Sequence, residues 1–137
     1  MADAPKKSKT VPRPTGFSKK FWEAGKEGKF LIQRDPEGGK YQFFPRPVAV
    51  WGSRRTPEWV EAKGTGTIIS YTHTTMAAAG FEDEVPYYLA IAKLDEGPRV
   101  FAQMVKDTKD PKIGDTVRIV WEDRDADFKI FKFQLAK

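Results

Sequence analysis

Residues 64–75 read GTGTIISYTHTT and have the strongest β-strand character in the chain. Isoleucine, threonine and tyrosine are enriched in strands, and Gly64 and Gly66 are typical of a tight turn or bulge where a strand begins. A glycine pair could also belong to a phosphate-binding loop. That motif needs a third glycine, a helix directly after it and a later acidic residue, which this stretch does not supply. The segment therefore predicts a strand that is entered through a glycine turn.

Shorter strand-like segments flank this one and are separated by turn residues. Upstream, residues 29–34 and 40–44 enclose the turn sequence DPEGG, which predicts a hairpin, and residues 48–51 are expected to form a further short strand. Downstream, turn signatures separate the strands that are predicted at 87–94, 99–105, 116–121 and 129–135. Regularly spaced short strands without a long helix predict a mainly β protein, and their order favours a five-stranded barrel of the OB type.

The N-terminal part of the chain has a different character. Prolines and a glycine interrupt residues 1–16, which we predict to be a disordered basic tail. Residues 17–28 predict a short helix with Ser18 as its N-cap and with Phe17, Phe21 and Trp22 along one side. A helix of two or three turns is not stable by itself. Its apolar side must therefore pack on the rest of the chain or on a partner protein.

The composition excludes several classes of protein. The 137 residues fit one domain, and they include one histidine, His73, and no cysteine. A disulfide scaffold, a thiolate metal site, a cysteine nucleophile and an iron–sulfur cluster are thereby ruled out. No apolar run approaches the 18 residues or so that a membrane span needs, and the sequence begins without the apolar stretch of a signal peptide. We therefore expect a cytoplasmic protein with no membrane partner.

The net charge of +5 is confined to the first 20 residues, that is, the tail and the start of the predicted helix. Residues 1–20 carry six basic residues and one acidic residue, whereas residues 21–137 carry eighteen of each. Binding to single-stranded nucleic acid needs a basic groove across the barrel, and the zero net charge of residues 21–137 does not favour such a groove. We therefore predict no nucleic-acid partner. The tail is either a solvated leader or an arm that settles on an acidic partner or a phosphate-bearing ligand.

Few side chains in the folded part suggest chemistry. Tyr71 and His73 lie two residues apart in a predicted strand and should share one face, where the histidine is either structural or able to bind a ligand. The acidic runs at 82–84 and 122–127 lack the spacing of a calcium loop and are predicted to be solvated. The aromatic residues are numerous enough to suggest a base-stacking surface or a protein–protein surface, and we favour the second. They include Tyr41, Phe43, Phe44, Trp51, Trp59, Tyr87 and Tyr88.

Motifs over residues 17–135 resemble one known family in their order. The matching segments are FWE at 21–23, GKFLIQR at 28–34, GK at 39–40, FPRP at 44–47, GS at 52–53, EWVE at 58–61, GTGTIISYT at 64–72, PYYLAIAKLDEG at 86–97 and IGD-x-V at 113–117. Together they are similar to the thiolase-associated family of zinc-ribbon and OB-fold acyl-CoA proteins, which contains the domain of unknown function thirty-five. The resemblance implies an N-terminal helix at 17–28, a rubredoxin-like ribbon at 29–60 and an OB fold at 61–137.

The chain departs from this family in the ribbon. Members normally carry two Cys-x-x-Cys pairs that hold zinc, and the equivalent positions here are Asp35 with Gly38 and, near the second pair, Val48 with Trp51. Aspartate alone cannot make a tetrahedral zinc site, so we predict a degenerate ribbon with no metal. Packing would have to replace the missing zinc. The residues available for it are Tyr41, Phe43, Phe44, Val48, Val50 and Trp51.

The resemblance also implies a function. Family members accompany thiolase-fold enzymes such as thiolases, hydroxymethylglutaryl-CoA synthases and sterol side-chain aldolases. The expectation is therefore a non-catalytic accessory subunit that forms a hetero-oligomer with a thiolase-fold protein, which supplies the nucleophilic cysteine. The chain would bind no cofactor directly, and a coenzyme A thioester would be the substrate of the complex. A free-standing acyl-CoA carrier, a very small enzyme and a single-stranded nucleic-acid-binding OB protein are the alternatives.

Residue type and strand parity suggest where such a subunit would make its contacts. The residues expected to face the acyl-CoA channel are Tyr71, His73 and Phe81, with Arg46 as a phosphate contact. The residues expected at the interface with the partner enzyme are Phe17, Phe21, Trp22, Phe43, Phe44 and Trp51. No catalytic residue and no metal ligand is predicted.

Overall fold

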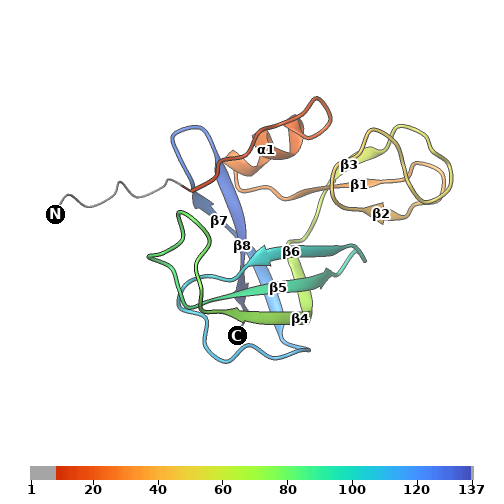
Figure 1. The fold of residues 1–137 in the computed structure, drawn as a ribbon. Helices are drawn as coiled ribbons and strands as arrows, with labels where there is room; N and C mark the ends of the chain where they lie inside the picture. The colour runs from red at the N-terminus through yellow and green to blue at the C-terminus, as the bar shows by residue number, and fades with distance from the viewer. Residues whose placement is uncertain (1–8, 137) are drawn as a thin grey trace.

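The computed structural model describes residues 9–136, which form one helix and eight strands (Figure 1). They are the helix α1 (Lys19–Lys26) and the strands β1 (Leu31–Arg34), β2 (Tyr41–Gln42), β3 (Glu58–Glu61), β4 (Thr65–Thr74), β5 (Tyr87–Leu94), β6 (Arg99–Gln103), β7 (Thr116–Asp123) and β8 (Lys129–Leu135). Strands β1 to β3 form a small sheet, called the ribbon below, beside a five-stranded barrel. No helix in the described part of the chain is long and apolar enough to cross a membrane.

The barrel is an antiparallel sheet that nearly closes on itself. Its strand order is β6-β5-β4-β7-β8. A parallel bridge between Met104 and Phe133 joins the two edges, where the Val105 amide donates a hydrogen bond of 2.9 Å to the Phe133 carbonyl. The predicted mainly β fold with a five-stranded barrel of the OB type is confirmed.

Both glycines at the start of β4 have a structural role. Gly64 has a φ of +81°, in the left-handed region that favours glycine, and a Cβ on Gly66 would lie 2.6 Å from the Lys93 carbonyl oxygen of β5. The register between β4 and β5 then shifts between Ile68 and Ser70, as at a β-bulge. The predicted glycine turn is therefore correct, and it lets β4 cross closely over β5.

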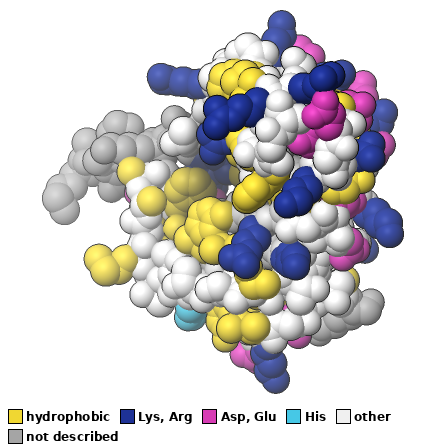
Figure 2. All heavy atoms as spheres, turned by 90° about the vertical axis from the view of Figure 1, so that its right-hand side faces the viewer, with side chains coloured by type: hydrophobic (Ala, Val, Ile, Leu, Met, Phe, Trp, Pro, Cys, Tyr) yellow, Lys and Arg dark blue, Asp and Glu magenta, His cyan; other side chains and the backbone are white. Residues whose placement is uncertain are grey.

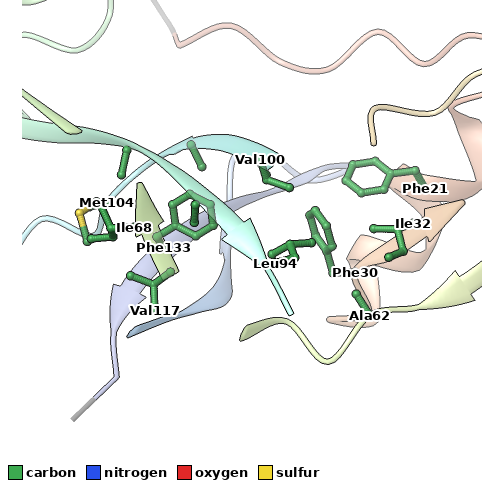
Figure 3. Close-up of a cluster of buried hydrophobic side chains, with 13 residues drawn as sticks. Phe21, Phe30, Ile32, Ala62, Ile68, Leu94, Val100, Met104, Val117 and Phe133 are labelled. Carbon is green, nitrogen blue, oxygen red and sulfur yellow. The ribbon is translucent and has the colours of Figure 1, made fainter. Parts of the chain in front are cut away.

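One continuous core runs from the barrel into the ribbon. Figure 3 shows barrel side chains such as Leu94 and Phe133 in line with Phe30 just before the ribbon, Ile32 of the ribbon and Phe21 of α1. Phe21 is completely buried, with its ring centroid 5.3 Å from that of Phe30 and 5.9 Å from that of Phe131 in β8. The helix therefore packs on its own chain, which decides between the two locations left open by the sequence.

The start of α1 differs from the predicted cap in its chemistry. Ser18 occupies the N-cap position, but its side chain makes no hydrogen bond to the helix. Its hydroxyl oxygen instead accepts a hydrogen bond of 2.8 Å from the amide of Thr15, so it fixes the preceding turn. Further along, a Cβ on Gly25 would lie 2.5 Å from the Trp121 ring, and this close approach seats α1 against β7.

The ribbon has the sheet order β2-β1-β3. The predicted hairpin is present, with Gln33 opposite Gln42, but the predicted strand at 48–51 is wrong. These residues form turns, because their amides have other partners: Ala49 donates to the Arg55 carbonyl at 2.7 Å, and Val50 donates to the Gln42 side chain at 2.9 Å. The free edge of β1 is taken by β3.

Polar side chains hold the two loops of the ribbon together. Asp35 is 1% exposed, and its Oδ1 accepts hydrogen bonds from the Ser53 hydroxyl at 2.6 Å and from the Glu37 amide at 3.0 Å. The Ser53 hydrogen bond contributes most to lowering the pKa of Asp35 below its usual range. Asp35 and Ser53 thus link the two loops of the ribbon.

A second buried pair ties the same loop to the sheet. The Gln42 side chain donates to Gln33 Oε1 at 2.9 Å and to the Val48 carbonyl at 3.1 Å, and the Arg46 amide donates to Gln33 Oε1 at 2.8 Å. The expectation that apolar packing replaces zinc is therefore wrong for the loop. Four of the residues expected to provide that packing are 42–59% exposed, namely Phe44, Val48, Val50 and Trp51.

The N-terminal segment of the described chain lies against the barrel. The Lys9 ammonium is 2.9 Å from Glu84 Oε2, and the Arg124 guanidinium donates to the Thr10 carbonyl at 2.6 Å. Residues 1–8 of the predicted disordered tail lie outside the described residues. Residues 9–16 have no regular secondary structure apart from a turn that begins at Gly16.

Candidate functional site

Tyr71 and His73 lie at the open end of the barrel. The pairing of β4 with β7 covers Thr65–Thr67, whereas its pairing with β5 continues to Thr74, so the second half of β4 extends past the closed part of the wall. Tyr71 is opposite the buried Ala90, and residues directly opposite in a sheet point to the same side. Both predicted residues therefore share the face that continues the barrel interior.

These two side chains meet Tyr88 of β5. The rings of His73 and Tyr88 are stacked, with centroids 4.6 Å apart and planes at 20°, and the Tyr71 ring is 6.1 Å from that of Tyr88 in an edge-on contact. Tyr71 remains 41% exposed. The predicted shared face is confirmed, and the structure adds Tyr88, which the sequence analysis did not assign to this site.

Two adjoining cavities follow this aromatic face, and we call them together the mouth groove. Their volumes are about 440 and 270 Å³, and Tyr88 and Asp110 line both. The opposite wall is the segment between β6 and β7, which contributes Lys106, Lys109 and Lys112. Glu84 and Asp110 also line the groove, so its three lysines exceed its carboxylates by one. Aromatic rings together with excess positive charge favour a ligand that combines a planar or apolar part with negative charge.

Phe81 lies between two cations rather than in the mouth groove. The Lys9 ammonium is 5.8 Å and the Arg124 guanidinium 5.5 Å from the centre of its ring. Phe81 is not among the residues that line either cavity of the groove. Its contacts join the loop before β5 to the N-terminal segment and to the β7–β8 hairpin.

Arg46 lines a different and larger cavity, which we call the ribbon cavity. This cavity has a volume of about 910 Å³ and lies between the ribbon and the turn that joins β5 to β6. The structure thus places the four predicted channel residues at three locations. It brings Tyr71 and His73 together, but it does not bring Arg46 or Phe81 to them.

The predicted interface residues differ in exposure. Phe17, Phe44 and Trp51 are 43%, 43% and 59% exposed. Trp22 and Phe43 are partly buried against the core, and Phe21 is completely buried. Phe21 therefore fixes α1 to its own chain, and the exposed three are free to contact a partner.

Glu84, which lines one cavity of the mouth groove, is the centre of a buried ion-pair cluster. Its carboxylate contacts the Lys132 ammonium at 3.1 Å, the Lys9 ammonium at 2.9 Å and the Gln103 amide at 2.9 Å. Lys132 is 3% exposed and also lies 2.5 Å from Glu122. Burial alone would raise the pKa of Glu84, but the hydrogen bonds from Lys9, Lys132 and Gln103 lower it to about 2.

The cluster corrects one sequence prediction. The acidic run at 82–84 is not wholly solvated, because Glu84 is buried. The alternation in β8 could have suggested this, since Lys132 lies between two phenylalanines, yet the distant partner of its charge could not be identified from the sequence. Within residues 9–136, no three histidine, cysteine, aspartate or glutamate side chains are grouped so that they could hold a metal ion.

Comparison with known sequences identifies the barrel. Residues 59–122 match the family model described as the C-terminal OB-fold domain of ChsH2. A DUF35 domain-containing scaffold protein of Pyrococcus furiosus is 36% identical over 86 residues, which are 62% of each chain. A scaffold protein of the same description from Methanothermobacter thermautotrophicus is 38% identical over 82 residues, or 58% of this chain and 62% of that one. The matched segment thus spans less than two thirds of these curated relatives.

A longer relative matches more of the chain. The probable enoyl-CoA hydratase alpha subunit of Thermomonospora curvata is 30% identical over 131 residues, which are 91% of this chain and 40% of that protein.

Solved structures agree with these matches. The Ltp2-ChsH2(DUF35) aldolase contains a chain that superposes with a TM-score of 0.81 at 26% identity, over 93% of this chain and all of that one. A DUF35 protein of unknown function from Sulfolobus solfataricus shares the fold, with a TM-score of 0.62 at 14% identity over 88% of this chain and 86% of that one. The barrel, the ribbon and these similarities agree with the resemblance drawn from the sequence motifs. The chain is therefore similar to DUF35 proteins in sequence and in fold, and it contains no cysteine.

Proposed function

We propose that the chain is a non-catalytic accessory subunit of a thiolase-fold enzyme, where it stabilises the complex and shapes the channel for a coenzyme A thioester. The observation that supports this most strongly is the similarity, over almost the whole of both chains, to the DUF35 chain of an aldolase named for two components. The description of two relatives as scaffold proteins points in the same direction.

The side chains at the open end of the barrel fit a supporting role. His73 stacks on Tyr88, so its ring contributes a flat surface to the groove. The chain has no cysteine, and a thiolase-type reaction needs a thiolate nucleophile. In this proposal the partner enzyme supplies the nucleophile and the base, and the accessory chain supplies part of the wall.

The mouth groove is the part of this chain that we assign to the thioester. Tyr71 and His73 would contact the apolar or pantetheine part, and the lysines of the opposite wall would face the phosphates. Phe81 would act from outside the groove by holding the loop before β5 in place. Arg46 lies in the other cavity and is left without a role in this channel.

Steady-state kinetics of the assembled complex test this assignment. We expect the double substitution Tyr71→Ala and His73→Ala to raise the KM for the acyl-CoA substrate about tenfold, which is the loss of roughly 1.4 kcal/mol of binding free energy. Met76→Ala, at an exposed residue outside the groove, is the matched control. If both variants have the KM and kcat of the wild-type complex, the mouth groove is not part of the channel.

The combination of stacked rings and lysines supports a second candidate function. Single-stranded nucleic acid binds to surfaces that combine aromatic side chains with positive charge. A fluorescent oligothymidylate titrated into the free chain at several salt concentrations distinguishes the two functions. Tight binding that weakens linearly with the logarithm of salt concentration would support nucleic-acid binding over the thioester.

A further inference from the structure

The ribbon cavity has an uneven distribution of charge. Three cationic side chains line it, Lys40 and Arg46 from the ribbon and Arg99 from the start of β6, and Glu96 is its one acidic lining residue. Within residues 9–136, Lys40, Arg46 and Arg99 form no ion pair, whereas their neighbours Arg34 and Arg55 are paired with glutamates. The cavity therefore carries an excess of positive charge, and none of its three cations is within ion-pair distance of an acidic side chain of the described chain.

The same cavity has an apolar rim. Trp51, Val50 and Phe44 line it and are 59%, 47% and 43% exposed. The Lys40 ammonium lies 5.8 Å from the centre of a ring of Trp51, so charge and apolar surface are adjacent. Figure 2 looks onto this end of the molecule and shows hydrophobic side chains interspersed with lysine and arginine. Tryptophan and arginine are the residues that most often dominate the energy of protein interfaces.

The rim is held in place before any partner arrives. Gln42 accepts a hydrogen bond from the Val50 amide and donates one to the Val48 carbonyl, and Asp35 accepts one from the Ser53 hydroxyl. An exposed apolar loop that is tied down in this way loses little conformational entropy on binding. Trp51 is not part of the hydrophobic core, so packing within the chain does not explain why a large apolar side chain stands at this position.

We infer that the ribbon cavity is the docking surface for the partner enzyme, and that it receives a segment of that enzyme which carries carboxylates next to an apolar side chain. This inference rests on the proposed function. The carboxylates would pair with the guanidinium groups of Arg46 and Arg99, and the apolar side chain would cover Trp51 and Val50. Arg46 thereby takes the role of a contact to protein carboxylates instead of a contact to a phosphate in the channel.

Charge also argues against a second copy of this chain as the occupant. A symmetric contact centred on this cavity would place the cations of one copy against those of the other, and like charges brought together in an interface weaken it. An acidic segment on the partner enzyme removes this repulsion.

The test uses the full chain and the enzyme that co-purifies with it from its host, identified by mass spectrometry as a thiolase-fold protein and then purified separately. We expect R46E/R99E to weaken the affinity between the two proteins about 100-fold, because buried charge pairs at interfaces are strongly coupled. The matched control R118E/K129E changes the charge equally on β7 and β8. It is expected to alter the affinity less than threefold, as is usual for charges outside a contact. Circular dichroism melts check that both variants are folded.

Two further measurements sharpen the result. Trp51→Ala is expected to weaken binding about tenfold or more, in the range of an interface residue that dominates the energy. An acidic residue of the enzyme that cross-links to this cavity is then replaced by lysine, and binding to R46E/R99E should be regained in part.

Each remaining outcome overturns the inference in a distinguishable way. If R46E/R99E binds the enzyme as tightly as the control does, docking occurs elsewhere and the proposed function stands. If the free chain binds coenzyme A through Arg46 and Arg99 while its affinity for the enzyme is unaffected by R46E/R99E, the cavity is a ligand site. If no thiolase-fold enzyme co-purifies, the proposed function fails together with the inference.

Discussion

Phe21 contacts side chains from every part of the fold. Its ring lies 4.9 Å from Trp22 of the helix, 5.3 Å from Phe30 before the ribbon, and 5.9 Å and 6.0 Å from Phe131 and Trp121 of the β7–β8 hairpin. Edge-on aromatic contacts of this kind add to the free energy of burying each ring. Phe21 therefore contributes strongly to the attachment of the helix, together with Trp22 and the close approach of Gly25 to Trp121.

Replacing Phe21 should therefore destabilise the whole chain. We expect Phe21→Ala to lower the free energy of unfolding by about 3–5 kcal/mol, the usual cost of removing a buried phenylalanine. Urea unfolding, followed by tryptophan fluorescence, measures the change. Phe17→Ala, at a residue that is 43% exposed, is the control and should cost less than about 1 kcal/mol. Equal effects of the two substitutions would contradict the packing described here.

Glu84 gives the chain a definite dependence on pH. Its pKa is lowered to about 2 in the folded state by Lys9, Lys132 and Gln103, against the ordinary value of about 4.3 for an unfolded glutamate. A depressed pKa means that the folded state favours the carboxylate. The resulting stability is fully present above about pH 5 and is lost as the pH falls toward 2.

Removing this carboxylate should remove part of the acid sensitivity. We expect Glu84→Gln to lower the free energy of unfolding at pH 7 by about 3 kcal/mol, because the buried Lys132 loses a partner. The difference from the wild type should shrink between pH 5 and pH 2. Glu61→Gln, at an exposed residue of β3, is the control. A difference that stays constant down to pH 2 would show that Glu84 is not charged in the folded state.

The ribbon is an element that keeps its form through side-chain hydrogen bonds. Asp35 and Ser53 join its two loops, and Gln33 and Gln42 connect the longer loop to the sheet. Buried polar groups that are fully paired can specify one arrangement of a loop. The exposed apolar rim of the ribbon cavity is therefore positioned by polar residues beneath it.

This account predicts how the ribbon responds to substitution and to a chelator. Asp35→Asn should speed tryptic cleavage in the loop that contains Arg46, Arg54 and Arg55, because the carboxylate that binds Ser53 is weakened as an acceptor. Cleavage fragments are quantified by mass spectrometry. Asp127→Asn, at an exposed turn, should cleave like the wild type. The addition of EDTA should leave the wild-type rate unchanged, and an acceleration by EDTA would mean that a metal ion holds the loops.

Regular elements could be predicted from the sequence where local pattern and tertiary context agree. The strands at 87–94 and 129–135 have the predicted limits, because turn residues bound them on both sides. The prediction of a strand at 48–51 was wrong. Two of its amides donate hydrogen bonds to the Gln42 side chain and to the Arg55 carbonyl, and the sequence gives no sign of either contact.

The candidate site could be predicted only in part. Strand parity placed Tyr71 and His73 on one face, but the addition of Tyr88 depends on the register of β5, and that register is set by a bulge in β4. Arg46 and Phe81 were grouped with them on residue type alone. Their separation follows from the packing of the ribbon and of the N-terminal segment, which are long-range contacts.

At the scale of the whole molecule, the mouth groove and the ribbon cavity have different linings. The mouth groove combines rings with lysines, and the ribbon cavity combines exposed apolar side chains with unpaired cations. One helix and one continuous core hold the barrel and the ribbon together, so each cavity has a fixed position on the chain. We interpret this arrangement as a subunit that holds an enzyme with one surface and a substrate with the other.

The most direct test of this account is a pull-down of the tagged full-length chain from its own host in gentle salt, with the co-purifying proteins identified and quantified by mass spectrometry. The account predicts a thiolase-fold enzyme in near-stoichiometric amount, whose activity on a coenzyme A thioester falls when the chain is removed. Recovery of the chain as a monomer without an enzyme would contradict it.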